Sequence, residues 1–264
     1  ASLMLWANAL GALNRYRVFD AIKQNSDPLN QGLYYDPKGI LLSPEGYAPI
    51  LNGYGYPPLI IHRAKLNQIL AAHLGANHIL VNAKFVGYTE GPDGIEVRFA
   101  DGTVIRADLL IGADRVHSKV RGRLIPDVCV TEDKGHVAWR AVIPPADILL
   151  GAEAFVIGHR RTRGGWLRTG NGLLFWSIAQ FIAGDTGTGT TRKDEVLARI
   201  DALDEGGWNF PLRRLVEATP ESKILRDAIL VVPTLPRWTS ARVALVVTPL
   251  TRCRHTWCPA RPWG

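Results

Sequence analysis

The residues with the clearest chemical potential lie where an apolar strand meets a glycine turn. Residues 108–111 indicate a strand, Gly112-Ala113-Asp114 follows, and residues 116–124 have helical character. A glycine at the end of a strand lets the backbone pass close to a dinucleotide, and the start of a helix favours anionic phosphate. The Asp114 carboxylate can accept hydrogen bonds from ribose hydroxyls or from backbone N–H groups. The motif alone fits a nucleotide site and a plain helix cap made by Asp114 about equally.

Other clusters of polar residues have simpler explanations. Arg160, Arg161, Arg163 and Arg168 bracket Gly164-Gly165, which indicates a solvated hairpin first and a phosphate or nicotinamide-dinucleotide site second. The glycine-rich segment 184–189 lacks the Lys-Ser/Thr ending of a phosphate loop and predicts a flexible turn. The seven histidines form no HxxxH or HExxH pair and no GxSxG elbow occurs, so hydrolase and metalloenzyme chemistry has little support.

Composition narrows the class of protein only partly. The chain has 264 residues, 47% of them apolar, and a net charge of +7, which suits nucleotide cofactors, nucleic acid or anionic membranes without selecting one. No window approaches the ~18 uncharged apolar residues of a membrane helix, so no integral membrane segment is expected. No basic face with stacking aromatics in a known module suggests nucleic-acid binding. Three cysteines form no disulfide framework, which favours a reducing cytoplasm.

The elements in the first half of the chain alternate between helices and short strands. Apolar residues at helical spacing predict one amphipathic helix over most of residues 3–24. Strands are predicted at 40–42, 59–61 and 78–81, and a helix at 63–74.

The second half is predicted to be richer in strands. Asp101-Gly102 joins the alternating runs 95–99 and 103–105, which predicts a tight hairpin. Residues 127–182 are rich in Val, Ile, Trp and Gly and predict a largely antiparallel sheet, in which Trp139 and Arg140 would pack and pair rather than react. Further elements are predicted as helices at 193–203 and 212–218 and a buried strand at 242–247.

The glycine turn resembles a motif of a known enzyme family. Residues 112–121, GADRVHSKVR, are similar to the GADGxxSxxR segment of class A FAD-dependent monooxygenases, the family of salicylate and para-hydroxybenzoate hydroxylases. Residues 5–13, 62–66, 138–144 and 235–246 resemble other segments of that family, in the same order.

The resemblance implies an α/β fold, α+β in part. It combines an incomplete FAD-binding Rossmann-like domain with an antiparallel β-sheet substrate domain. The FAD-binding domain would take residues 1–126 and 233–247, with 27–61 contributing to the substrate sheet, and the substrate domain would take 127–232. Residues 248–264 are expected to form an irregular tail.

The resemblance also implies a chemistry and a set of cofactor contacts. NAD(P)H would reduce FAD, O2 would react with the reduced flavin, and a flavin C4a-hydroperoxide would hydroxylate a small aromatic, usually phenolic, substrate. In relatives the arginine that matches Arg63 contacts the flavin, whereas by itself Arg63 would be a solvated or ion-paired arginine. Arg63, Gly112 and Asp114 are therefore the expected FAD contacts. No catalytic acid or base and no metal ligand is assigned, because the cofactor performs the difficult chemistry.

The sequence departs from the family pattern at three places. The sequence contains no GxGxxG unit, so we expect the family's N-terminal fingerprint to be missing, and Arg115 stands where the family has glycine, which opposes a close backbone approach there. After residues 243–246 the family continues with Gly-Asp-Ala-Ala-His, and reading the codons one base earlier makes this segment compatible with that motif. We therefore expect a frame-shifted translation from residue 247 or 248 onward. Cys253, His255 and Cys258 would then be accidental rather than a metal site, because no fourth ligand is near.

Two alternative functions stay open at this point. One is a non-catalytic, truncated remnant of such an enzyme. The other is a flavin-dependent reductase or dehydrogenase on the same fold. Bound yellow flavin and the dependence of NAD(P)H oxidation on phenols would separate these functions.

Overall fold

The fold is described from a computed structural model. It covers residues 2–29, 32–43, 53–128, 131–144, 153–158, 162–170, 172–182, 191–203, 211–232 and 234–246. The chain divides into two compact units, each described by itself. The first comprises Ala1–Ile79 and Gly135–Asp227, and the second comprises Leu80–Lys134 and Ala228–Gly264.

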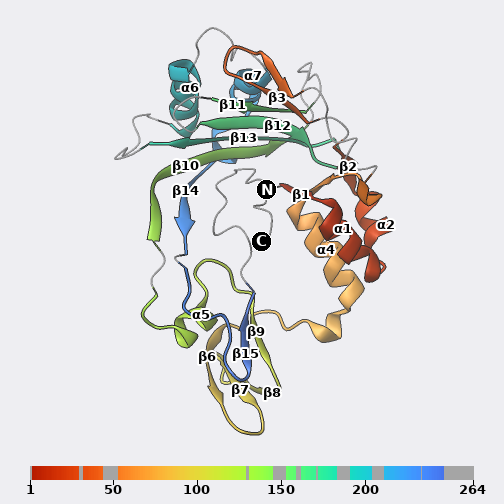
Figure 1. Cartoon of the computed structure of the whole chain (residues 1–264), viewed down its shortest axis with the longest axis vertical. Helices are drawn as coiled ribbons and strands as arrows, with labels where there is room; N and C mark the ends of the chain where they lie inside the picture. Colours follow the sequence, from red (N-terminus) through yellow and green to blue (C-terminus); the bar gives the residue numbers. More distant parts are fainter. Residues whose placement is uncertain are drawn as a thin grey trace. The chain divides into compact units, whose positions relative to one another are not determined.

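A seven-stranded sheet dominates the first unit (Figure 1). Its strands, in spatial order, are β14 (Leu225–Val231), β10 (Thr131–Ile143), β13 (Leu174–Phe181), β12 (Arg163–Arg168), β11 (Ala154–Ile157), β3 (Leu33–Tyr35) and β4 (Leu41–Ser43). Strands β10 to β13 pair in antiparallel fashion, as predicted for residues 127–182, whereas β3 pairs with β11 in parallel. The mixed α/β class with an antiparallel sheet is thereby confirmed.

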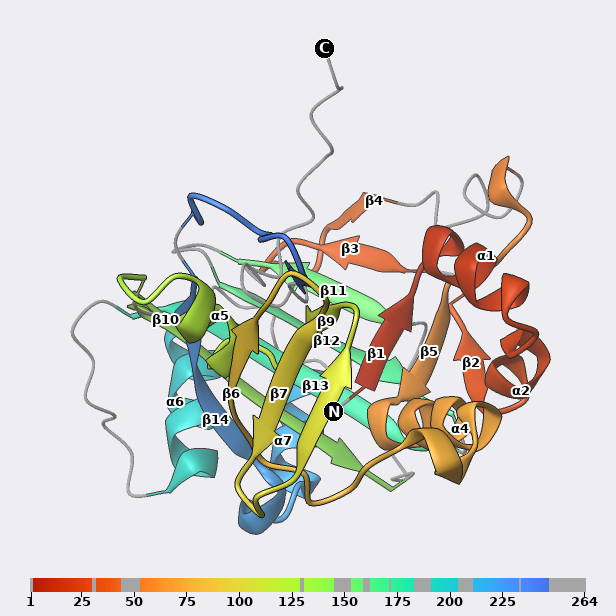
Figure 2. The same ribbon diagram turned by 90° about the horizontal axis from the view of Figure 1, so that it is seen from below.

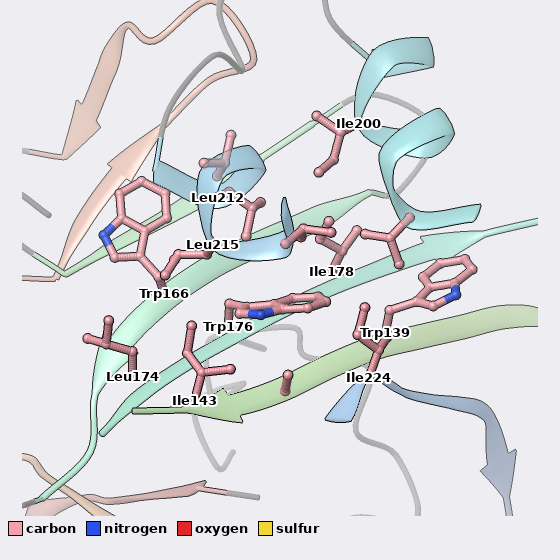
Figure 3. Packing of buried hydrophobic residues seen from close by; sticks show 14 of the residues in the cluster. Trp139, Ile143, Trp166, Leu174, Trp176, Ile178, Ile200, Leu212, Leu215 and Ile224 are labelled. Atoms are coloured by element: carbon pink, nitrogen blue, oxygen red, sulfur yellow. The ribbon is translucent and has the colours of Figure 1, made fainter. Parts of the chain in front are cut away.

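Two helices cover one face of this sheet, α6 (Arg192–Leu203) and α7 (Pro211–Ala218) (Figure 1). Alternation along β13 explains why: Trp176 and Ile178 are fully buried, while Phe175 and Ser177 on the other face are half-buried. In Figure 3, Trp176 and Ile178 lie together with Leu212 and Leu215 of α7. Both helices agree with the predicted ranges 193–203 and 212–218.

Two buried tryptophans of this core hydrogen-bond to side chains of other elements. The Trp176 indole Nε1 donates to Thr219 Oγ1 over 2.8 Å, and the Trp139 Nε1 donates to Glu195 Oε2 over 3.1 Å. The Glu195 carboxylate, which is buried, also accepts from Arg226 Nε. These bonds satisfy groups that would otherwise be costly to bury.

The first unit also contains a three-stranded antiparallel sheet with its own helices. The strands are β1 (Ser2–Leu5), β5 (Leu59–His62) and β2 (Ser26–Pro28), in the order β1-β5-β2, and the helices are α1 (Ala7–Arg15), α2 (Phe19–Lys23) and α4 (Arg63–Leu74). The helix predicted at 63–74 is confirmed. The single helix predicted over 3–24 is wrong, because Ser2–Leu5 pairs with β5 and Arg17, at φ 56°, interrupts the helical path.

The second unit consists mainly of strands. Figure 2 shows the antiparallel meander of β6 (Phe85–Glu90), β7 (Ile95–Phe99) and β8 (Val104–Ala107), which confirms the predicted hairpin. Strand β9 (Leu110–Gly112) pairs in parallel with β15 (Val243–Leu245), and the short helix α5 (Lys119–Leu124) follows β9. The strand predicted at 78–81 is wrong, since Ala76–His78 forms a 3-10 turn and Val81 is 77% exposed.

Helix α5 packs on the meander and on the parallel pair. Its buried residues Val120 and Leu124 join a core with Tyr88, Val243 and Leu245. The packing fixes the position of the turn between β9 and α5.

The division into FAD-binding and substrate domains stays a prediction. Two predicted features lie outside the described residues: the turn at 184–189 and the tail at 248–264.

Candidate active site

Gly112 ends β9 at a point where a side chain would not fit. A Cβ atom added there would lie 2.8 Å from Val120 Cγ1 and 3.0 Å from Leu245 Cδ2. Such contacts are shorter than van der Waals packing allows. Gly112 is therefore required for the close approach of α5 to the β9–β15 pair, whatever it contributes to a ligand.

Asp114 caps the helix that follows it. Its Oδ2 atom accepts the backbone N–H groups of Lys119 over 2.7 Å and of Val120 over 3.2 Å. The side chain is exposed, and its Oδ1 atom accepts no hydrogen bond from the described residues. One carboxylate oxygen thus holds the turn, and the other is available to a hydroxyl donor.

The backbone N–H groups at the start of α5 already donate to side chains of the protein. Ser118 Oγ accepts from the Arg121 backbone N–H over 2.9 Å, in addition to the two N–H groups held by Asp114. The helix start therefore does not offer these groups to a phosphate, in contrast to the expectation from the motif. Ser118 was not singled out from the sequence, although serine is a preferred residue at the position directly before a helix.

Arg115 adopts the left-handed conformation that the family's glycine would favour. Its φ is 70°, a value that costs a non-glycine residue free energy but is accessible. The side chain is exposed, so the backbone path of the turn is kept while a side chain is added next to Asp114. Nearby, the buried Arg121 donates from Nη2 to the Val116 carbonyl over 2.6 Å and fixes the loop before α5.

Arg63 is the first residue of α4, in the other compact unit. It is half-buried, and its guanidinium makes no hydrogen bond or ion pair with any described residue. The described part of the chain therefore contains no acidic partner that would make Arg63 an ion-paired structural residue. Of the three expected FAD contacts, Gly112 and Asp114 lie in the same turn of the second unit, and Arg63 lies in the first unit.

The remaining sequence candidates have structural roles. Trp139 is buried and Arg140 pairs with Asp227 over 2.7 Å, as expected. Arg168 pairs with Glu153 over 3.2 Å, and burial lowers the pKa of Arg163.

The glycines between these two arginines lie within β12 rather than at a hairpin turn. At Gly165 a Cβ would lie 2.6 Å from the Ala154 carbonyl oxygen, so the position requires glycine for strand packing. Arg160, Arg161, Cys253, His255 and Cys258 lie outside the described residues.

No helix of the described ranges has both the length and the apolar character needed to cross a bilayer.

Comparisons with known proteins identify relatives over most of the chain, although no family model matches. The aurachin C monooxygenase/isomerase of Stigmatella aurantiaca is 28% identical over 247 residues, which are 93% of this chain and 63% of that protein. The 6-hydroxynicotinate 3-monooxygenase of Bordetella bronchiseptica is 28% identical over 73% of this chain and 50% of its own length. The chain thus spans less than two thirds of these relatives.

Solved structures show the same fold. Klebsiella pneumoniae HpxO, crystallised with FAD and uric acid, superposes with a TM-score of 0.80 at 22% identity, over 93% of this chain and 63% of that chain. The structure of CtdE with FAD and a substrate superposes with a TM-score of 0.74 at 17% identity, over 95% of this chain and 64% of that chain. Both sequence relatives are monooxygenases by name, a further relative is the FAD-dependent urate hydroxylase of Klebsiella pneumoniae, and the resemblance of this chain to the class A family is confirmed.

Proposed function

We propose that this chain is part of a FAD-dependent monooxygenase that uses NAD(P)H and O2 to hydroxylate a small aromatic substrate in a reducing cytoplasm. The observation that carries the proposal is the turn at Gly112 and Asp114, with one carboxylate oxygen engaged in the fold and one unengaged. The order of motifs and the sequence relatives support the same assignment.

The described residues fit FAD in two respects. The unengaged Asp114 Oδ1 can accept a hydrogen bond from a ribose or ribityl hydroxyl, because a carboxylate has four acceptor positions and only Oδ2 is used. The Arg63 guanidinium, which has no partner among the described residues, can donate to an anionic or carbonyl group of the cofactor. FAD, when bound, supplies hydride acceptance and oxygen activation. The role of the chain's own residues is to bind and orient the cofactor and substrate.

The sheet of the first unit offers a surface suited to a flat aromatic ring. Across from the face covered by α6 and α7, Tyr34 and Phe155 stack with ring centroids 5.2 Å apart. Gly165 stands opposite Phe155 in the register, and Ser177 stands opposite Gly165. Aromatic rings together with the hydroxyl groups of Tyr34 and Ser177 favour a planar substrate bearing a polar substituent.

The proposal is tested first by flavin binding. FAD titrated into the full chain should show saturable quenching of flavin fluorescence. Asp114→Asn should weaken binding about tenfold, since a charge-assisted hydrogen bond is lost while the amide oxygen can still cap α5. Arg63→Gln should weaken it similarly. Asp101→Asn, in a hairpin of the same unit as Asp114, is the matched control and should bind normally.

The activity is tested by following NAD(P)H oxidation with and without phenols. Substrate-dependent oxidation with a hydroxylated product supports a monooxygenase, and oxidation without product hydroxylation supports a reductase. Absence of FAD binding in the folded chain would contradict both.

A further inference from the structure

The second unit contains a pocket that the flavin assignment does not use. It has a volume of about 380 Å³ and is open to solvent. It is formed where β6, the end of α5 and the segment before β15 meet. The residues used below are Tyr88, Glu90, Arg123, Leu124, Arg237 and Ser240.

The pocket lies at the opposite ends of the strands from the Gly112 turn. Strands β9 and β15 run in parallel, with Gly112 beside Leu245 at their carboxyl ends. Ser240 precedes the amino end of β15, and Arg123 is in the last turn of α5, whereas Asp114 caps its first turn. A ligand here would therefore not share the residues that bind FAD in the proposed function.

Two guanidinium groups line the pocket. Arg237 donates from Nη2 to the Leu124 carbonyl over 2.7 Å, at the end of α5 where carbonyl groups lack helical partners. This bond anchors one arm of the guanidinium and leaves its other N–H groups available. Arg123 is exposed and makes no hydrogen bond or ion pair within the described residues.

The acidic group in the pocket is already engaged. Both oxygens of Glu90 accept from Ser240 Oγ over 2.9 Å, and Oε2 also accepts the Arg242 backbone N–H over 2.9 Å. Glu90 therefore fixes the segment before β15 rather than pairing with Arg123 or Arg237. The two arginines leave an excess of positive charge at the pocket.

Tyr88 adds a neutral donor. The residue is only 6% exposed, it lines the pocket, and its hydroxyl makes no hydrogen bond with any described group. Burial, and next Glu90, raise the pKa of Tyr88, while Arg123 and Arg237 oppose the rise. The phenol therefore keeps its proton at neutral pH and can donate it to an acceptor.

We propose that this pocket binds a tetrahedral oxyanion, either free phosphate or the phosphate group of a nucleotide. Two guanidinium groups and a hydroxyl provide several donors at one place, while both oxygens of the one carboxylate already accept hydrogen bonds, and phosphate oxygens require such a set of donors. The source of the phosphate is decided by experiment.

Isothermal titration calorimetry on the full chain provides the test, with inorganic phosphate in one arm and AMP in the other at constant ionic strength. Wild type should bind saturably. Arg123→Gln should weaken binding about tenfold and Tyr88→Phe by a smaller factor, since each removes one donor and the arginine also removes a charge. Tighter binding of AMP with the same dependence on Arg123 assigns a nucleotide, and equal binding assigns free phosphate.

The matched control is Arg106→Gln, which removes one positive charge from an exposed side chain of β8 in the same unit. It should leave binding unchanged. Asp114→Asn should also leave it unchanged, which separates this pocket from the proposed flavin site. Near-ultraviolet circular dichroism checks that each variant is folded. No saturable binding of either probe, or equal weakening by Arg106→Gln, would overturn the proposal.

Discussion

The seven-stranded sheet of the first unit and the parallel β9–β15 pair of the second differ in how completely they are covered. On the first, α6 and α7 bury Trp139, Trp176 and Ile178 completely. Beside the second, Leu109, Ile111 and Val246 are each more than half exposed. Parallel strands are normally covered on both faces.

This difference indicates that the seven-stranded sheet is the structural scaffold and that the turn after β9 belongs to the candidate site. The sheet owes its stability to a large apolar core, in which the indole groups of Trp139 and Trp176 donate to Glu195 and Thr219. The turn after β9 is held by a glycine contact and three capping hydrogen bonds. Substitutions in the sheet should therefore change stability strongly, and substitutions at the turn should act locally.

The largest expected effect is that of Trp176→Ala. The side chain is fully buried and its loss also leaves Thr219 without its indole donor, so unfolding should become easier by about 3–5 kcal/mol. Urea denaturation followed by tryptophan fluorescence measures the change. Trp238→Ala, at a residue 45% exposed in the second unit, should cost less than about 1 kcal/mol. Similar costs for the two variants would contradict the contrast between the units.

Gly112→Ala should have an intermediate effect. The new methyl group would meet Val120 and Leu245, and overpacking of this kind costs about 1–3 kcal/mol. Val120→Ala introduced into the same variant should restore part of the loss. In α5, a Cβ at Gly122 would meet nothing within 4 Å, so Gly122→Ala should instead stabilise by about 0.5–1 kcal/mol. A Gly112→Ala variant as stable as wild type would contradict this prediction and would show that α5 can lie farther from the β9–β15 pair. Thermal denaturation of the variants compares them.

The smallest expected effect concerns Asp101, in the hairpin between β7 and β8. The Thr103 backbone N–H donates to its carboxylate over 2.9 Å and lowers the pKa of Asp101 below the ordinary value of an aspartate. A folded pKa below the unfolded one contributes stability that is present above the unfolded pKa and is lost as the pH falls through the folded pKa. The stability difference between wild type and Asp101→Asn should therefore shrink in acid. Titration of the carboxyl group by NMR checks the direction, and a pKa at or above its ordinary value would refute it.

Helices and hairpins could be predicted where the pattern of apolar residues agrees with the residues that end the element. The helix at Arg63–Leu74 follows a strand that ends at His62 and stops at Gly75, whose φ of 86° favours glycine. The Asp101-Gly102 hairpin was predictable from its turn residues, and Gly102 has a φ of 86°. Local sequence decides such elements.

The secondary-structure predictions were wrong where tertiary contacts, rather than the local sequence, decide the conformation. Apolar residues at 3–5 fit a helix pattern, but pairing with β5 makes them a strand. The run at 78–81 looks like a strand, yet no described strand pairs with it. For the site, the sequence located Asp114 but could not show which oxygen caps α5. The pocket with Tyr88, Arg123 and Arg237 was missed, because its residues are far apart in the chain and carry no motif.

The parallel pairing of β3 with β11 has a consequence for biosynthesis. Leu33 aligns with Ala154, so β3 and β4 leave the ribosome long before the strand that completes their hydrogen bonding exists. Until then they present an unpaired backbone edge to other nascent chains. We expect slow refolding in vitro and a need for chaperones during translation, since contacts between distant segments form late.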